Sequence, residues 1–189
     1  MALLSKILAR RRYATIAPYI KGDVLDLGCY DAHIYEKYAR EITTYCGVER
    51  SASAVKELSR QYPAASFYTR DLDCDPLALG KQFDCVLILA LIEHLFNQKF
   101  VMQQVAKVLK PSGIIVIITP TPFGNDVVHR WGAVLGLFAK SAVDDHICIY
   151  NRQRFRILAS EIGLTLRYHR YFQVFCNQIA LLEKPAILL

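Results

Sequence analysis

The sequence predicts a doubly wound α/β fold, in which a mostly parallel sheet of seven strands carries helices on both faces. Segments with strand character alternate with segments of helical periodicity along the 189 residues, a pattern typical of right-handed βαβ units. The run 83–91 is almost entirely apolar, as expected for a parallel strand that is covered on both sides. The stretch 24–32 joins a strand, a glycine and the start of a helix. Such a junction is expected to leave backbone N–H groups pointing outward, which can form a cradle for a ligand.

The first five elements alternate between helix and strand. In chain order they are a helix at 2–19, a strand at 23–27, a helical segment at 34–39, a strand at 43–48 that leads into Glu49, and a helix that ends near residue 61. Ser51 carries a hydroxyl that can accept a hydrogen bond from the first turn of this last helix, so we place its N-cap there.

The remaining elements complete the sheet. They are a short strand at 65–68, the apolar strand at 83–91, a helix at 98–109 closed by residues 110–113, a strand at 114–119, a helix capped by Asn151 that runs to residue 162, and strands at 165–171 and 177–183. Gly163 supplies the residue that commonly ends a helix. The last two strands are predicted to be an antiparallel pair, so the last strand of the sheet is antiparallel.

Composition favours a single domain over residues 1–189 that stays in the cytoplasm. Hydrophobic residues make up 53% of the chain, which supports a filled core. No apolar run reaches the roughly 18 residues that a membrane span requires. The six cysteines are scattered and form no C-x-x-C pair, so we expect buried, reduced thiols rather than a disulfide framework or a zinc site.

The N-terminal segment is basic. Residues 1–22 contain five lysines and arginines and no acidic residue. Apolar residues beside Arg10, Arg11 and Arg12 fit a transit peptide, a membrane-surface helix over residues 1–12, or an amphipathic helix packed before the first strand. We favour the packed helix, because the first strand follows without a spacer.

A ligand site is expected at the carboxyl ends of the strands, where the strand order of such a sheet reverses. Glu49, Asp71 and the stretch 90–94 all fall at predicted carboxyl ends. A pyrophosphate would require glycines after Gly28, but Tyr30 and Ala32 occupy the positions where glycines would help. The turn therefore suits a ligand without phosphate that makes one close approach.

These residues resemble class I S-adenosylmethionine-dependent methyltransferases. The motifs that carry the resemblance are Val24–Cys29, Gly47–Glu49, Asp71-Leu72, Phe83–Val86 running to Leu91–Leu95, and Val108–Gly113 with Thr119-Pro120. They occur in the family's order across residues 24–120, and the strand at 177–184 weakly resembles the family's last strand. The resemblance implies a Rossmann-like methyltransferase fold, methyltransferase activity and S-adenosylmethionine as cofactor.

The resemblance also implies roles for individual residues. Asp26 and the Gly28 turn would hold the methionine end of the cofactor, and Glu49 would accept hydrogen bonds from both ribose hydroxyls. Asp71 would meet the adenine amine, and the backbone at 89–91 would lie near the sulfonium. The implied cofactor-binding residues are Asp26, Gly28, Cys29, Tyr30, Glu49, Asp71, Leu72 and Ala90.

The chain departs from the family at three of its motif positions. Tyr30 and Ala32 replace the second and third glycines of the first motif, and Ala90 replaces a polar residue that many relatives carry. A side chain at position 30 could line the methionine pocket or partly block it. A non-catalytic binding protein with a degenerate cofactor site is therefore the alternative to an enzyme.

Two histidines lie in segments that border the predicted site. His94 is interpreted as a hydrogen-bonded residue that holds the loop after the apolar strand, although it could face the cofactor or the substrate. His146 is our candidate for a general base that removes a proton from the acceptor, with a surface histidine as the alternative. No metal site is predicted, because the sequence shows no Cys/His cluster.

The segment 121–150 is predicted to cover the substrate. Its apolar residues between Trp131 and Phe138 have helical spacing, which fits a helix packed on the sheet, a lid, or a surface at 127–140 for an apolar acceptor or a membrane. We expect in-line methyl transfer to a small molecule or a carbohydrate or lipid precursor. A nucleic-acid methyltransferase ranks last, because no aromatic platform for single strands accompanies the basic N-terminus.

Overall fold

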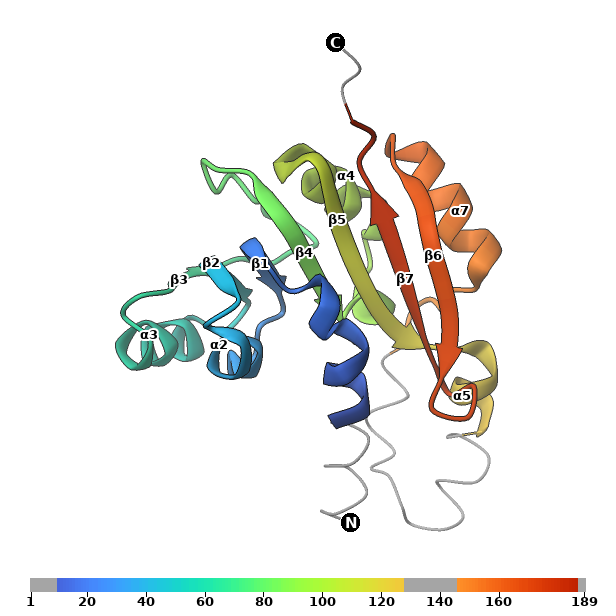
Figure 1. The fold of residues 1–189 in the computed structure, drawn as a ribbon, viewed down its shortest axis with the longest axis horizontal. Coiled ribbons are helices and arrows are strands. Elements are labelled where there is room, and N and C mark those ends of the chain that lie inside the picture. The colour runs from blue at the N-terminus through green and yellow to red at the C-terminus, as the bar shows by residue number, and fades with distance from the viewer. Residues whose placement is uncertain (1–9, 128–145, 187–189) are drawn as a thin grey trace.

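A computed structural model of the chain describes residues 10–127 and 146–186. Its seven strands form one sheet in the order β3-β2-β1-β4-β5-β7-β6 (Figure 1). Strands β1 to β5 pair in parallel, and β7 is antiparallel to both of its neighbours. The strands are β1 (Gly22–Leu27), β2 (Ile42–Glu49), β3 (Ser66–Thr69), β4 (Phe83–Leu89), β5 (Leu109–Pro120), β6 (Thr165–Phe172) and β7 (Asn177–Glu183). The predicted fold class is confirmed.

Helices cover both faces of this sheet, as predicted. They are α2 (His33–Tyr38), α3 (Ala52–Gln61), α4 (Gln98–Val108), α5 (Pro122–Val127) and α7 (Arg152–Glu161), with 3-10 turns η1 (Ala17–Tyr19) and η2 (Ile92–His94). Residues 10–16 form the described part of the N-terminal helix. Within the described residues, no helix is both long and apolar enough to cross a membrane.

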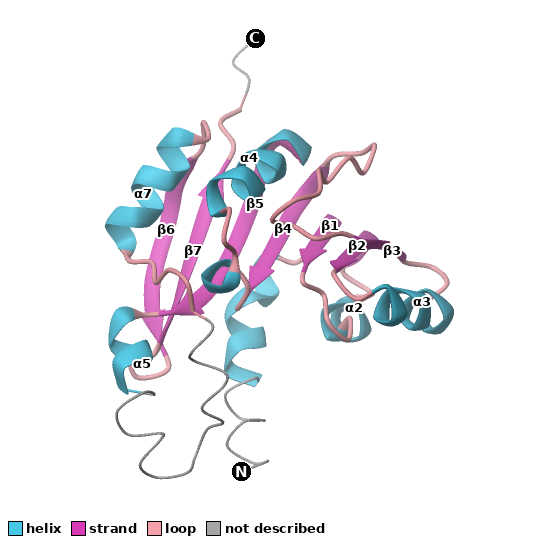
Figure 2. Ribbon diagram, turned by 180° about the vertical axis from the view of Figure 1, so that it is seen from behind, coloured by secondary structure: helices cyan, strands magenta, loops and turns pink. Residues whose placement is uncertain are grey.

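Alternate residues of the strands enter two separate cores, one on each face. Leu25 and Leu27 of β1 pack with buried residues of α4 and α7, the helices nearest the viewer in Figure 2. Val24 packs on the other face, with Ile16 of the N-terminal helix and Leu58 of α3. This alternation has the two-residue period of a strand, and it assigns Asp26 to the face that the N-terminal helix covers.

The predicted helix ends are confirmed by their caps. The Ser51 hydroxyl accepts a hydrogen bond from the Ala54 amide at 3.3 Å, and the Asn151 side chain accepts one from the Arg154 amide at 2.9 Å. Gly163 follows α7 in the left-handed region, with φ +72°. Each cap depends on residues within one helical turn, so the local sequence was sufficient to locate it.

Two strand boundaries differ from the prediction by more than one residue. β4 ends at Leu89 rather than at residue 91, because Ala90 adopts a left-handed φ of +52°. β5 begins at Leu109, which pairs with Phe83 across a register shift. The predicted closing turn at 110–113 is therefore wrong, since these residues lie inside the strand.

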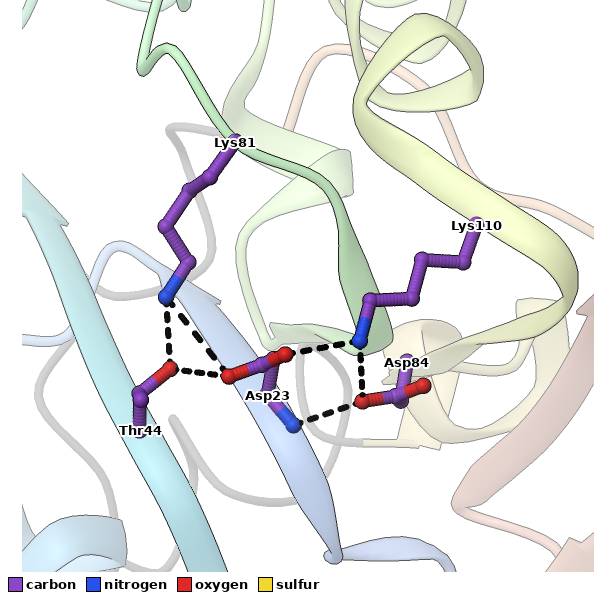
Figure 3. Close-up of polar contacts among 5 residues, drawn as sticks. All are labelled: Asp23, Thr44, Lys81, Asp84 and Lys110. Atoms are coloured by element: carbon purple, nitrogen blue, oxygen red, sulfur yellow. Dashed lines mark hydrogen bonds and ion pairs between the residues drawn. The ribbon is translucent and has the colours of Figure 1, made fainter.

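The amino ends of the central strands are joined by a network of charged side chains (Figure 3). The Lys110 ammonium lies 2.7 Å from Asp23 Oδ2 and 2.8 Å from Asp84 Oδ2. The Asp23 amide donates to Asp84 Oδ2 at 2.8 Å. Thr44 donates to Asp23, and Lys81 lies 2.5 Å from the Thr44 hydroxyl. The network connects β1, β2, β4 and β5 at the end of the sheet opposite the predicted ligand site.

We expect Lys110→Met to move acid unfolding to a higher pH. The hydrogen bond from Lys110, followed by that from Thr44, lowers the pKa of Asp23 below its ordinary 3.8. A carboxylate with a lowered pKa stabilises the fold above its unfolded pKa, and this contribution is lost as the pH falls through the folded pKa. Without Lys110, the pKa of Asp23 is less strongly lowered, so Asp23 becomes protonated at a higher pH during acid titration. Circular dichroism during acid titration measures the midpoint, and Lys107→Met at the exposed end of α4 is the control. Equal midpoints in the two variants would contradict a stabilising role for the network.

Candidate functional site

The strand order reverses between β1 and β4, and the two loops that follow these strands are in contact. A Cβ placed on Gly28 would lie 3.2 Å from a methyl carbon of Leu91, and Gly28 itself has φ +68°. Both the left-handed backbone and the close neighbour favour glycine at this position. In open α/β sheets a ligand binds at this place, beyond the carboxyl ends of the strands.

The turn after β1 does not present its amides as the sequence suggested. The Gly28 and Cys29 amides both donate to the Val48 carbonyl, at 2.8 and 3.1 Å, and the Ala32 amide donates to the Cys29 carbonyl at 2.7 Å. The Tyr30 amide lies 3.3 Å from Glu49 Oε2. The expected cradle of outward N–H groups is therefore wrong for these four residues, because β2 and the turn itself accept their hydrogen bonds.

Asp26 is a buried carboxylate near the end of β1. Its exposed fraction is 3%, and the Tyr45 hydroxyl donates to its Oδ2 at 2.8 Å. Burial raises the pKa of Asp26 to about 7, although the hydrogen bond from Tyr45 opposes this rise. A positively charged group of a ligand beside Asp26 would lower this pKa again and favour the ionised carboxylate.

The N-terminal helix contributes Arg12, which the sequence alone shows only as part of a basic segment. Its Nε atom is buried and has no hydrogen-bond partner among the described residues. Burial raises the pKa of Glu93, and the Arg12 charge opposes this rise. Burial and the charge of Asp31 raise the pKa of Tyr13, and the Arg12 charge opposes that rise as well. Arg12 therefore lies near both the β1 turn and η2, and the helix that carries it runs beside the carboxyl ends of the strands (Figure 1).

Glu49 ends β2 and is held by backbone amides. Its Oε1 accepts hydrogen bonds from the Arg50 amide at 2.8 Å and the Ser51 amide at 3.1 Å, and its Oε2 faces the Tyr30 amide. The Glu49 side chain is partly exposed at the carboxyl end of β2, beside the turn that follows β1. A carboxylate has about four acceptor positions, and three of them are used here. Glu49 therefore retains one position for a ligand hydroxyl, and a second hydroxyl would replace the Tyr30 amide, whose contact is the longest of the three at 3.3 Å.

The loop after β3 folds around Asp71. Its Oδ1 accepts a hydrogen bond from the Asp73 amide at 3.2 Å, and its own amide donates to Asp75 Oδ2 at 2.8 Å. Arg50 Nε lies 3.4 Å from Asp71 Oδ2, which connects this loop to the end of β2. The Leu72 side chain is buried in the core that faces α4 and α7.

Glu93, His94 and His146 lie close together beside this site. From the sequence alone there was no sign that the two histidines are neighbours. Glu93 is 1% exposed, and the Thr119 hydroxyl donates to its Oε2 at 2.9 Å. The rings of His94 and His146 have centroids 4.9 Å apart. Burial raises the pKa of the Glu93 carboxyl. No spacing rule could have indicated this cluster, because it joins two segments far apart in the chain.

Other predicted features lie elsewhere or outside the described residues. The apolar segment Trp131 to Phe138 and most of the proposed membrane segments, 1–12 and 127–140, are not described. All six cysteines are free, and burial raises the pKa of Cys46 to about 12. A surface pocket of about 740 Å³ lies at the opposite end of the sheet, between Lys21, Asp84 and Arg167.

Comparison with known proteins identifies the family. A family model described as a methyltransferase domain matches residues 4–169. The chain belongs to the S-adenosylmethionine-dependent methyltransferase family. It is 32% identical over 99 residues to the ubiquinone biosynthesis O-methyltransferase of Rhizobium leguminosarum bv. trifolii, covering 51% of this chain and 39% of that one. The enzyme of the same name from Bartonella bacilliformis is 26% identical over 126 residues, or 65% and 49% of the two chains. The chain thus spans about half of these relatives or less.

Solved methyltransferase structures share the fold. The N-methyltransferase NodS from Bradyrhizobium japonicum WM9, in complex with S-adenosylhomocysteine, aligns with a TM-score of 0.67 at 16% identity, covering 93% of this chain and 87% of NodS. Magnesium protoporphyrin IX methyltransferase from Synechocystis PCC 6803 aligns with a TM-score of 0.65 at 15% identity, covering 95% and 81%.

Three residues at which this chain departs from the family motif adopt the left-handed backbone conformation, although none of them is glycine. Tyr30, Ala32 and Ala90 have φ of +50°, +53° and +52°, a conformation that costs a non-glycine residue about 1–2 kcal/mol. The Tyr30 side chain is 79% exposed. The first turn therefore keeps a backbone that suits glycine at positions 30 and 32, although glycine is absent from both.

Proposed function

We propose that the protein transfers a methyl group from S-adenosylmethionine to a hydroxyl group of a small molecule, or of a carbohydrate or lipid precursor. The observation that carries the proposal is the presence of two buried groups of opposite charge near the β1–β4 reversal, neither of which has a described ion-pair partner. Asp26 is a buried carboxylate with a raised pKa, and Arg12 has a buried Nε without a described partner. The methionine part of the cofactor carries an ammonium and a carboxylate, which match these two groups.

The remaining residues complete the cofactor site in this proposal. Glu49, already held by three backbone amides, binds the ribose hydroxyls. Asp71 and Leu72 bind the adenine, and Ala90 lies near the sulfonium. Gly28, Cys29 and Tyr30 border the methionine part through the turn that follows β1. The donor set therefore fits the cofactor that the family uses.

S-adenosylmethionine, when bound, supplies a methyl group that is already activated by its sulfonium charge. The protein has to align the acceptor with that methyl group and exclude water, which are the main contributions expected from a bound pair of reactants. His146, at the edge where an acceptor would lie, is the proposed general base and would take the acceptor proton on a ring nitrogen. The names of the two curated relatives, both O-methyltransferases, favour an acceptor oxygen.

Titration calorimetry with S-adenosylhomocysteine tests the proposal. We expect saturable binding with one ligand per chain, and methyl transfer from isotopically labelled S-adenosylmethionine to hydroxyl acceptors. Absence of binding at millimolar ligand would overturn the enzyme proposal. Binding without transfer to any acceptor would favour the second candidate, a binding protein, which the substitutions at Tyr30 and Ala32 support.

Tyr30→Gly tests whether the side chain at position 30 strains the turn or takes part in the cofactor site. Glycine removes the left-handed strain, so we expect the free energy of unfolding to rise by about 1 kcal/mol. Because the Tyr30 ring is mostly exposed, few packing contacts are lost. Affinity for S-adenosylhomocysteine should be unchanged or higher. A large loss of affinity would instead show that the Tyr30 side chain is part of the binding site, and a lower stability would contradict the strain argument.

A further inference from the structure

Three potential metal ligands converge where the loop after β4 meets the segment at 146–150, which precedes α7. Glu93 and His94 belong to η2, and His146 comes from the other segment. One ligand atom from each residue lies within 4.8 Å of the other two. The carboxylate is buried, whereas both imidazoles are partly exposed. The cluster can therefore be reached from solvent on the side of the histidines.

Contacts within the protein bring these segments together without any ion. The Ile147 amide donates to the Glu93 carbonyl at 2.7 Å, directly beside His146. The two imidazole rings lie 4.9 Å apart with their planes inclined by 59°. The backbone thus places the three side chains in one position, so that an ion would have to order little beyond side-chain rotations.

The carboxylate of Glu93 is oriented by a neighbouring side chain. Thr119, itself buried at the end of β5, donates its hydroxyl to Glu93 Oε2 at 2.9 Å. Hydrogen bonds of this kind commonly orient the ligands of metal sites from outside the coordination sphere. A cation at the cluster would also compensate a carboxylate that is otherwise buried at a cost in free energy.

The ligand types select the kind of ion. Two imidazoles and one carboxylate favour Zn²⁺ and similar transition-metal ions over Mg²⁺ and Ca²⁺, which prefer oxygen ligands. Bonds of about 2.0–2.2 Å in a tetrahedral site place ligand atoms about 3.4 Å apart. Binding an ion would therefore require the ligand atoms, which now lie within 4.8 Å of one another, to move closer through rotation of the partly exposed imidazoles. Three protein ligands leave a fourth position open, as in catalytic zinc sites.

We propose that Glu93, His94 and His146 form a binding site for a divalent transition-metal ion of the Zn²⁺ class, with one position open to an exogenous oxygen. The site lies next to the proposed cofactor pocket, because Leu91, two residues before Glu93, packs against Gly28. In this proposal His146 is a metal ligand and not the general base. The ion instead makes the acceptor hydroxyl more acidic, and water takes its proton.

The open position gives the ion a role that rests on the proposed function. An acceptor hydroxyl bound there has a lowered pKa and releases its proton to water. The acceptor oxygen forms its bond to the methyl carbon as the bond from that carbon to sulfur breaks, and the electron pair of the broken bond stays on sulfur. Charges balance, and no oxidant or reductant is required.

Metal binding to the full chain, after removal of adventitious metal with a chelator, tests the site directly. Cys74 is an exposed thiol, so Cys74→Ser is the background for all variants. We expect one equivalent of Co²⁺ or Zn²⁺ to bind per chain, and Co²⁺ to give visible absorption without an intense thiolate charge-transfer band. His94→Asn and His146→Asn should each weaken binding at least tenfold. His33→Asn, a partly exposed histidine of α2 outside the cluster, should leave it unchanged.

The outcomes distinguish this inference from the proposed function. Absence of stoichiometric binding, or equal affinity in the two cluster variants and in His33→Asn, would overturn the metal site. Circular dichroism of each variant verifies that it folds, and two independent histidine substitutions guard against one that does not. S-adenosylhomocysteine is titrated in parallel: its binding without metal binding retains the proposed cofactor site alone, and metal binding without it retains the metal site alone.

Discussion

Asp26→Asn should stabilise the protein above neutral pH and at the same time weaken its affinity for S-adenosylhomocysteine. The pKa of Asp26 rises from 3.8 to about 7 on folding, mainly because the side chain is buried. A carboxyl group with a raised folded pKa contributes stability in its protonated form, and that contribution is lost as the pH rises through the folded pKa. Asparagine is neutral at every pH and still accepts a hydrogen bond from Tyr45, so the variant avoids the loss.

The gain has a predictable size and pH dependence. A shift of roughly three units at 1.4 kcal/mol each sets an upper limit of about 4 kcal/mol. Urea unfolding from about pH 5 to pH 8 should show an advantage for Asp26→Asn that grows with pH. Asp31→Asn removes the same charge at an exposed position of the same turn. The growth of its advantage with pH should be much smaller, because the charge of Asp31 is only the last of the three causes that set the pKa of Asp26. An advantage that is equal for both variants would contradict the raised pKa.

The affinity loss follows from the proposed pairing of Asp26 with the ammonium group of the cofactor. Removing a buried charged partner from a hydrogen bond costs about 1.5–3 kcal/mol, which corresponds to a loss of roughly tenfold to a hundredfold. Titration calorimetry at neutral pH measures it, with Asp31→Asn as the control. If Asp26→Asn shows the stability gain but an unchanged affinity, Asp26 is a destabilising buried carboxylate that does not bind the cofactor.

Glu49→Ala should reduce the affinity for S-adenosylhomocysteine by about a hundredfold or more. Two hydrogen bonds from the ribose to a charged carboxylate contribute about 1.5–3 kcal/mol each, and every 1.4 kcal/mol is a tenfold change. The fold should tolerate the substitution, because the amides of Tyr30, Arg50 and Ser51 that now bind Glu49 are near solvent and can bind water instead. Titration calorimetry measures the affinity, and thermal unfolding measures the stability.

Two variants serve as references for Glu49→Ala. Glu49→Gln keeps the shape but only one acceptor oxygen, so its affinity should be intermediate. Glu57→Ala removes an exposed carboxylate from α3 that pairs with Arg60 at 2.7 Å, and its affinity should be that of the unsubstituted protein. If Glu49→Ala stays within about threefold of that value, the ribose role is wrong, since even a single such bond is worth a tenfold change.

The sequence by itself determined the order of helices and strands and the class of the sheet. Ser51, Asn151 and Gly163 located helix ends because each acts within one turn of its helix. Short apolar runs located the central strands, because a parallel strand that is covered on both faces buries side chains on both sides. Glu49 was correctly placed at the end of β2 for the same reason. The cofactor was predicted from the family resemblance. That resemblance could be recognised from the sequence because the family's motifs follow one another in order along the chain.

The tertiary structure alone decided where hydrogen bonds and charges across the site are satisfied. The Val48 carbonyl of β2 accepts the amides of Gly28 and Cys29, so the turn that seemed free in the sequence is occupied by a neighbouring strand. Arg12 reaches the site only because its helix packs on the face that contains Asp26. Glu93 and His146 meet through a backbone contact between distant segments. These contacts depend on strand pairing and on packing between residues far apart in the chain. The spacing of neighbouring residues in the sequence therefore cannot predict them.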